Sequence, residues 1–125
     1  MADMGYRSVQ VSVTNDTRGD LTVQSGAVGD GDAWLVGEAP TQGGSFGQYH
    51  QAQWGVSTND INGTAAGQIQ LAGLGSWPVA IVFMNDDNGI STCSVTPNDQ
   101  IKANVVQQET GEPNHSAFVV QLIPG

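Results

Sequence analysis

Residues 7–14, Arg-Ser-Val-Gln-Val-Ser-Val-Thr, alternate between polar and apolar side chains. Val9, Val11 and Val13 would lie on one face of an extended chain, because successive side chains of a strand point to opposite faces. A period of two is typical of a strand with one buried face and does not fit an amphipathic helix. The stretch therefore predicts a β-strand whose valines face a core.

Similar short runs recur along the chain, and turn-forming residues separate them. The runs cover 21–24, 33–36, 64–71, 77–84, 90–95, 101–105 and 116–123. The turn cluster at 15–20 predicts a hairpin between the first two strands, and Pro78 limits full pairing to the residues after it. No stretch has the spacing of three and four residues that indicates a helix. We predict an all-β fold, an antiparallel β-sandwich that forms a single domain over residues 1–125.

The charge of the chain limits the partners that it can bind. The 125 residues include twelve acidic and three basic side chains, which give a formal net charge of -9. Nucleic acid is excluded as a partner, because a protein that binds it typically neutralises about 6–10 phosphates. The same charge opposes binding to anionic membranes, so a membrane target should be neutral or zwitterionic lipid, or a receptor.

The sequence also bears on where the protein is made. No apolar run approaches the roughly 20 residues of a membrane-spanning helix. Residues 1–6 have neither the basic start nor the apolar stretch of a secretory signal peptide. We expect synthesis in the cytoplasm without a signal peptide, and action at target-cell membranes after release by another route.

Few residues of the chain suit catalysis. His50 and His115 are the only side chains whose ordinary pKa lies near neutrality, and no nucleophile-elbow motif accompanies them. The single cysteine, Cys93, is expected to be a buried small hydrophobe. The acidic loops at 29–32 and 85–89 lack the spacing of an EF-hand and are expected to be solvated turns. We therefore expect a protein that is not an enzyme and holds no cofactor and no metal.

The Gly- and Gln-rich stretch that ends at Trp54 is the best candidate for a binding surface. It carries Phe46, Tyr49 and Trp54 among small and amide side chains. Tyr and Trp suit a bilayer interface, with an apolar body and a polar tip, and they also suit stacking against sugars. The alternative is that these rings fill the core of the sandwich. Trp34 and Trp77 have apolar neighbours, which favours the core for both.

Three short motifs are spread in order along most of the chain. They are Arg7-x-Val-x-Val-x-Val-x-Asn15-x-Thr17, Gly31-x-x-Trp34 and Ser116-x-x-Val-Val-Gln121. With these motifs the chain resembles aegerolysin-type proteins, which include small bacterial insecticidal proteins and fungal members. The resemblance implies a β-sandwich that recognises a membrane lipid or an invertebrate gut-cell surface, with a second, larger pore-forming protein as partner. It also implies a lipid-contacting role for Trp34.

Three functions are open at this point. The first is the membrane-binding component of a pore-forming, insecticidal toxin system, with Trp34, Phe46, Tyr49 and Trp54 as contact residues. The second is a lectin-like β-sandwich that binds carbohydrate through the acidic loops and the same rings. The third is a structural or assembly subunit, a homo-oligomer whose copies meet at exposed strand edges.

Overall fold

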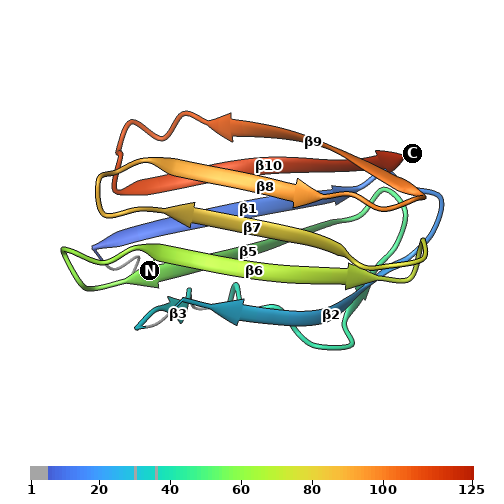
Figure 1. Cartoon of the computed structure of the whole chain (residues 1–125), viewed down its shortest axis with the longest axis horizontal. Helices are drawn as coiled ribbons and strands as arrows, with labels where there is room; N and C mark the ends of the chain where they lie inside the picture. Colours follow the sequence, from blue (N-terminus) through green and yellow to red (C-terminus); the bar gives the residue numbers. More distant parts are fainter. Residues whose placement is uncertain (1–5, 30, 36) are drawn as a thin grey trace.

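The computed structural model describes residues 6–29, 31–35 and 37–125. Ten strands form two five-stranded sheets that lie face to face (Figure 1). The strands are β1 (Arg7–Asn15), β2 (Leu21–Val28), β3 (Ala33–Trp34), β4 (Ser45–Phe46), β5 (Gln51–Thr58), β6 (Ala65–Ala72), β7 (Val79–Asn85), β8 (Ser91–Thr96), β9 (Ile101–Gln108) and β10 (His115–Pro124). Within these described ranges, no helix could cross a membrane.

The first sheet has the strand order β3-β5-β1-β10-β9, and the second has the order β4-β2-β6-β7-β8. Every neighbouring pair is antiparallel except β1 and β10, which run parallel with Val11 opposite Phe118. Nearly the whole chain connects β1 to β10, and parallel strands need such a long connection. The predicted all-β sandwich is confirmed, with one parallel pair within its antiparallel sheets.

The predicted hairpin between the first two strands is wrong, because β1 and β2 belong to different sheets. The turn reverses the chain and carries it across the core. The Asn15 side chain holds this turn: its Nδ2 donates to the carbonyl oxygens of Gly19 (2.9 Å) and Phe46 (3.0 Å), and its Oδ1 accepts from the Thr17 backbone N–H (3.0 Å). Turn-forming residues indicate a reversal, but they do not say which sheet the next strand joins.

Strand β5 lies where the sequence indicates only a Gly- and Gln-rich stretch. Its residues Ala52, Trp54 and Val56 face Val13, Val11 and Val9 of β1 in the register of the first sheet. The other predicted strands are observed with shifted ends, and β7 begins at Val79, directly after Pro78. Val36 of the predicted strand 33–36 and Asp30 of the predicted acidic loop lie outside the described residues, as do residues 1–5.

The core lies between the inner faces of the two sheets. Its fully buried members include Val9, Val11 and Val13 of β1, as the period of two predicts, and Phe83 of β7. Gly67 of β6 has a packing role, because a Cβ at this position would lie 2.7 Å from the Phe83 ring and 2.7 Å from Cγ2 of Val56 in the opposite sheet. The absence of a side chain lets the two sheets approach closely at this point.

Candidate functional site

The strand directions gather four loops at one end of the sandwich, which we call the aromatic end. These loops are 16–20, 47–50, 73–78 and 97–100. Figure 1 shows them on the right, beside the chain end marked C. Two of the loops carry the exposed rings of Tyr49 and Trp77. The fold thus brings to one end of the molecule two aromatic residues that are far apart in sequence.

The opposite end, which we call the acidic end, includes the loops 59–64, 86–90 and 109–114 (left in Figure 1). The carboxylates of these three loops are Asp60, Asp86, Asp87, Glu109 and Glu112, and the loops contain no basic residue. The nearest base is Arg7, which is buried and donates its guanidinium hydrogens to the backbone carbonyls of Gly63 and Asp87. The loops of the aromatic end carry fewer carboxylates, Asp16, Asp20 and Asp99, beside Arg18.

Trp77 is the exposed indole of the aromatic end, with 51% of its surface accessible. Its Nε1 donates to the Pro97 carbonyl oxygen at 3.0 Å, so the polar edge of the ring is satisfied within the protein. The Asn98 amide donates to the carbonyl oxygens of Trp77 (2.7 Å) and Leu74 (2.8 Å), which holds the loop backbone. The expectation that Trp77 lies in the core is wrong. Pro78 delays the start of β7, so the indole lies beyond the sheet.

Tyr49 is the second exposed ring of the aromatic end, with 76% of its surface accessible. Its φ of 72° lies in the left-handed region, which costs a residue other than glycine about 1–3 kcal/mol. Neighbouring backbone holds this conformation: the Tyr49 N–H donates to the Asn15 carbonyl oxygen (2.6 Å), and the His50 N–H donates to the Gly47 carbonyl oxygen (3.0 Å). A strained backbone that presents a ring to solvent is typical of a functional surface.

Replacement of Tyr49 should test whether the ring has a structural role. We expect Tyr49→Gly to keep the fold and to raise the free energy of unfolding by up to about 1 kcal/mol, because glycine adopts a positive φ without strain. Tyr49→Asn is a second variant, since asparagine also tolerates this region. Denaturant unfolding measures both. A loss of more than about 1 kcal/mol in each variant would mean that the ring stabilises the fold.

A further pair of hydrogen bonds joins two loops of the aromatic end. The Ser76 backbone N–H and the Ser76 hydroxyl both donate to the Asp99 carboxylate, at 2.7 Å each. The bond from the backbone N–H, followed by the bond from the hydroxyl, lowers the pKa of Asp99 below its ordinary value. The loop that carries Trp77 is therefore joined to 97–100 through Ser76 as well as through Asn98.

The lowered pKa of Asp99 makes this contact sensitive to acid. The Asp99 carboxylate takes up a proton at a higher pH in the unfolded chain than in the folded chain. The hydrogen bonds from Ser76 therefore stabilise the fold above the ordinary pKa of Asp. It is lost as the pH falls through the lowered pKa of the folded state. In Ser76→Ala, which keeps the backbone bond, we expect the pKa of Asp99 to rise toward its ordinary value. NMR titration of the carboxyl carbon measures this pKa, and an unchanged value would contradict the assignment.

The four binding candidates from the sequence occupy different environments. Trp54 is buried in the core, and Phe46 is half-buried against it, with the two ring centroids 6.0 Å apart in an edge-to-face contact. Trp34 is half-buried against the core beside Val56, toward the acidic end. Only Tyr49 is exposed. The structure therefore joins Tyr49 with Trp77 at one end and leaves the other three rings in packing roles.

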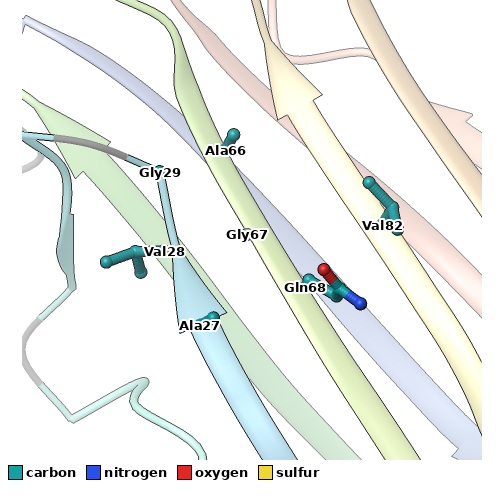
Figure 2. A pocket seen from close by; sticks show the side chains of 7 residues that line it. All are labelled: Ala27, Val28, Gly29, Ala66, Gly67, Gln68 and Val82. Carbon is teal, nitrogen blue, oxygen red and sulfur yellow. The ribbon is translucent and has the colours of Figure 1, made fainter.

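Two hollows of the surface have mainly apolar linings. One has a volume of about 250 Å³, and Phe46, Trp54 and Ala52 are among its lining residues. The other, of about 190 Å³, lies between β2, β6 and β7, with Gln68 and Val82 among its lining residues (Figure 2). Neither hollow is lined by an ionisable side chain, so the residues that line them supply no general acid or base.

The side chains with catalytic chemistry do not form an evident active site. The Ser8 hydroxyl oxygen lies 2.8 Å from Nδ1 of His115, but Ser8 is fully buried, so a substrate could not reach this hydroxyl. His50 is exposed in its loop. Burial raises the pKa of the Cys93 thiol to about 11, so the thiol is protonated at neutral pH. Among the residues that the structure describes, no three His, Cys, Asp or Glu side chains could together hold a metal ion.

Comparison with known proteins gives no match among family models and none among curated proteins. Solved structures with a similar fold exist. IP-1A from Alcaligenes faecalis is similar with a TM-score of 0.64 and 10% identity, over 97% of this chain and 94% of that chain. The lipid binding protein Nakanori is similar with a TM-score of 0.65 and 18% identity, over 98% of this chain and 72% of that chain. At these identities the likeness is one of fold.

Proposed function

We propose that this protein binds the surface of a lipid membrane through its aromatic end, with Trp77 and Tyr49 as the contact residues. The observation that carries the proposal is the exposure of both rings at the end of the sandwich whose loops carry fewer carboxylates. The similarity to a lipid binding protein of the same fold supports it. The resemblance of the sequence to aegerolysin-type proteins supports it as well. Membership of this chain in that family stays a prediction.

The chemistry of Trp77 fits the interfacial layer of a bilayer. Aromatic rings with an apolar body and a polar tip gather at the level of the lipid headgroups. The indole N–H of Trp77 already has a partner in the Pro97 carbonyl, so the ring enters this layer without losing a hydrogen bond to water. Full burial of a large apolar side chain contributes about 1.5–3 kcal/mol, and Trp77 has about half of its surface left to bury.

The charges decide which end approaches the membrane. Exposed side chains with apolar surface also occur at the acidic end, where Ile61 and Ile90 lie in the loops and Tyr6 directly precedes β1. The same loops contain carboxylates. An anionic surface repels a carboxylate, and contact with a zwitterionic surface removes the carboxylate from water, which costs free energy. The aromatic end carries fewer acids, and one of them, Asp99, accepts two hydrogen bonds from Ser76. We therefore expect neutral or zwitterionic lipid as the target.

Co-sedimentation of the full chain with vesicles tests the proposal. The panel contains phosphatidylcholine, phosphatidylcholine with sphingomyelin, and phosphatidylcholine with phosphatidylserine, with and without cholesterol. We expect binding to at least one uncharged composition and weaker binding when phosphatidylserine is added. No sedimentation with any composition would contradict the proposal.

Two finer or alternative functions are tested with the same material. The role as a component of a pore-forming, insecticidal toxin system rests on the sequence resemblance, and dye release from the bound vesicles on addition of a larger pore-forming protein would support it. A lectin-like function predicts binding to a glycan array in place of vesicles. Binding to glycans with no binding to lipid would replace membrane binding by carbohydrate binding as the function.

A further inference from the structure

A hollow opens between the two sheets on the side of the sandwich where the edge strands are short. Strands β3 and β4 have two residues each, and β3 pairs with Val56 and Ser57 near the end of β5. Residues 51–54 of β5 therefore have no described strand beside them on that side. The segment 37–44 passes there instead and contributes residues to a hollow of about 250 Å³.

This hollow reaches the core of the sandwich. Its walls come from both sheets: Val23 and Phe46 belong to the second sheet, and Ala52 and Trp54 belong to the first. The valines of β1 have no exposed surface, whereas Val23 and Trp54 keep 4% and 5%. Because both residues line the hollow, the core is open to solvent at this place.

Hydrogen bonds hold the rim of the hollow. The Val23 N–H donates to the Gly44 carbonyl oxygen at 2.8 Å, which ties the segment to β2. The Glu38 carboxylate accepts from the side-chain amides of Gln10 (2.8 Å) and Gln53 (3.1 Å), which ties the same segment to the first sheet. A rim that is already ordered loses little freedom when a ligand enters, and this favours binding.

The Trp54 indole offers a hydrogen bond inside the hollow. Unlike the Trp77 N–H, which donates to the Pro97 carbonyl, the Trp54 N–H has no acceptor among the residues that the structure describes. The side-chain atoms that are buried without a partner in these residues belong to Arg7, Asn85 and Ser116. The Trp54 nitrogen is not one of them, so it stays accessible although the residue is 95% buried, and the hollow is the open space that Trp54 lines.

The lining favours a small uncharged ligand. Beside its apolar side chains it contains the hydroxyls of Thr41 and Ser45, the amide of Gln51 and no ionisable group. The Glu38 carboxylate on the same segment and the net charge of -9 disfavour an anion. An apolar cavity of about 150 Å³ binds benzene, and pockets for drug-sized molecules have about 300–1,000 Å³. The hollow therefore suits part of a hydrocarbon chain.

We propose that this hollow binds an uncharged aliphatic chain that ends in a hydroxyl or ester oxygen. The chain lies against Phe46 and Trp54, and the oxygen accepts the hydrogen bond of the Trp54 N–H. A free long-chain alcohol and the chain of a membrane lipid share this chemistry. The site is separate from the contact residues Tyr49 and Trp77, so it goes beyond the proposed membrane contact.

Quenching of tryptophan emission by octanol that carries bromine at the end of its chain tests the site. The full-length variant Trp77→Phe is used, because it retains only the indoles of Trp34 and Trp54. Bromine quenches an indole that it touches, and Trp34 does not line the hollow. We expect saturable quenching of up to about half of the emission. The wavelength should not shift, because Trp54 is already removed from water.

A matched ligand and matched variants identify the hollow as the place of binding. Bromo-octanoate has the same chain with a charged end, and it should bind about tenfold more weakly (about 1.4 kcal/mol). Ala52→Leu fills the hollow and should weaken binding of the alcohol by a similar factor. Ala117→Leu on β10 adds the same side chain outside the lining and should leave the affinity unchanged. Thermal unfolding of both variants checks that they fold.

Vesicles of phosphatidylcholine with brominated chains distinguish the two sources of the ligand. Quenching by the alcohol alone assigns the site to a free aliphatic molecule, and quenching by the vesicles as well assigns it to a lipid chain. Absence of saturable quenching by either, equal affinity for alcohol and carboxylate, or undiminished quenching in folded Ala52→Leu would overturn the site. Vesicle sedimentation without quenching would leave the membrane contact intact, so the two proposals can fail separately.

Discussion

Trp77→Ala is expected to weaken binding to uncharged vesicles about tenfold. The indole has about half of its surface exposed, and its transfer into the interfacial layer contributes on the order of 1–2 kcal/mol. In the variant that also contains Tyr49→Ala, the loss should reach about a hundredfold if the two rings act independently. Vesicle titration followed by sedimentation measures both.

The acidic end provides the matched control. Ile61→Ala and Ile90→Ala remove exposed apolar side chains of the opposite loops. We expect these variants to bind like the native protein, with unchanged stability. Equal losses of vesicle affinity for Trp77→Ala and Ile61→Ala would mean that neither end is the specific membrane-binding surface. A loss confined to the isoleucine variants would place the contact at the acidic end.

Asn15→Ala is expected to have the largest effect on stability, a loss of about 3 kcal/mol. The side chain is fully buried and donates to the Gly19 and Phe46 carbonyls. It also accepts hydrogen bonds from the N–H and the hydroxyl of Thr17. Removal leaves several groups without a partner, and a buried polar group in this state costs about 1–3 kcal/mol. Denaturant unfolding measures the change.

Asn62→Ala is the control for this prediction, because Asn62 lies exposed in a loop of the acidic end. Its change in the free energy of unfolding should stay within about 0.5 kcal/mol. An Asn15 variant as stable as the control would mean that the crossover from β1 to β2 forms without these hydrogen bonds. The Asn15 side chain also donates to the Phe46 carbonyl, in the segment that leads to Tyr49, so vesicle binding by the variant should fall even under conditions where it is folded.

The fold class follows from local patterns in the sequence. The valine alternation of β1 predicts its buried face, and Pro78 predicts where β7 begins. These features depend on neighbouring residues in the chain, so a single sequence contains them. The crossing from β1 to β2 depends on which sheet accepts the second strand, and that choice is made by packing across the core. The glycines and glutamines around Trp54 hide the alternation of β5, although Ala52, Trp54 and Val56 do follow it.

The candidate site was harder to predict than the fold. Aromatic residues near apolar neighbours occur both in cores and at surfaces. Trp54, which the sequence favours as a binding residue, is buried, and Trp77, which the sequence favours as a core residue, is exposed. Exposure depends on whether a ring lies within a strand or beyond its end. The proline after Trp77 contains this information, because a strand that starts after Pro78 leaves the preceding ring outside the sheet. Tyr49 is one of the four candidates from the sequence and its ring is exposed, but the strained φ that orients it appears only in the structure.

Tryptophan emission during vesicle titration tests the location of the membrane contact most directly. The native protein has two indoles that pack against the core, Trp34 and Trp54, and one exposed indole, Trp77. We predict that vesicles shift the emission of the native protein to shorter wavelength and that Trp77→Phe, which keeps an apolar ring for binding, shows no shift although it still sediments with the vesicles. A shift of equal size in Trp77→Phe would contradict the assignment of the aromatic end as the membrane-binding surface.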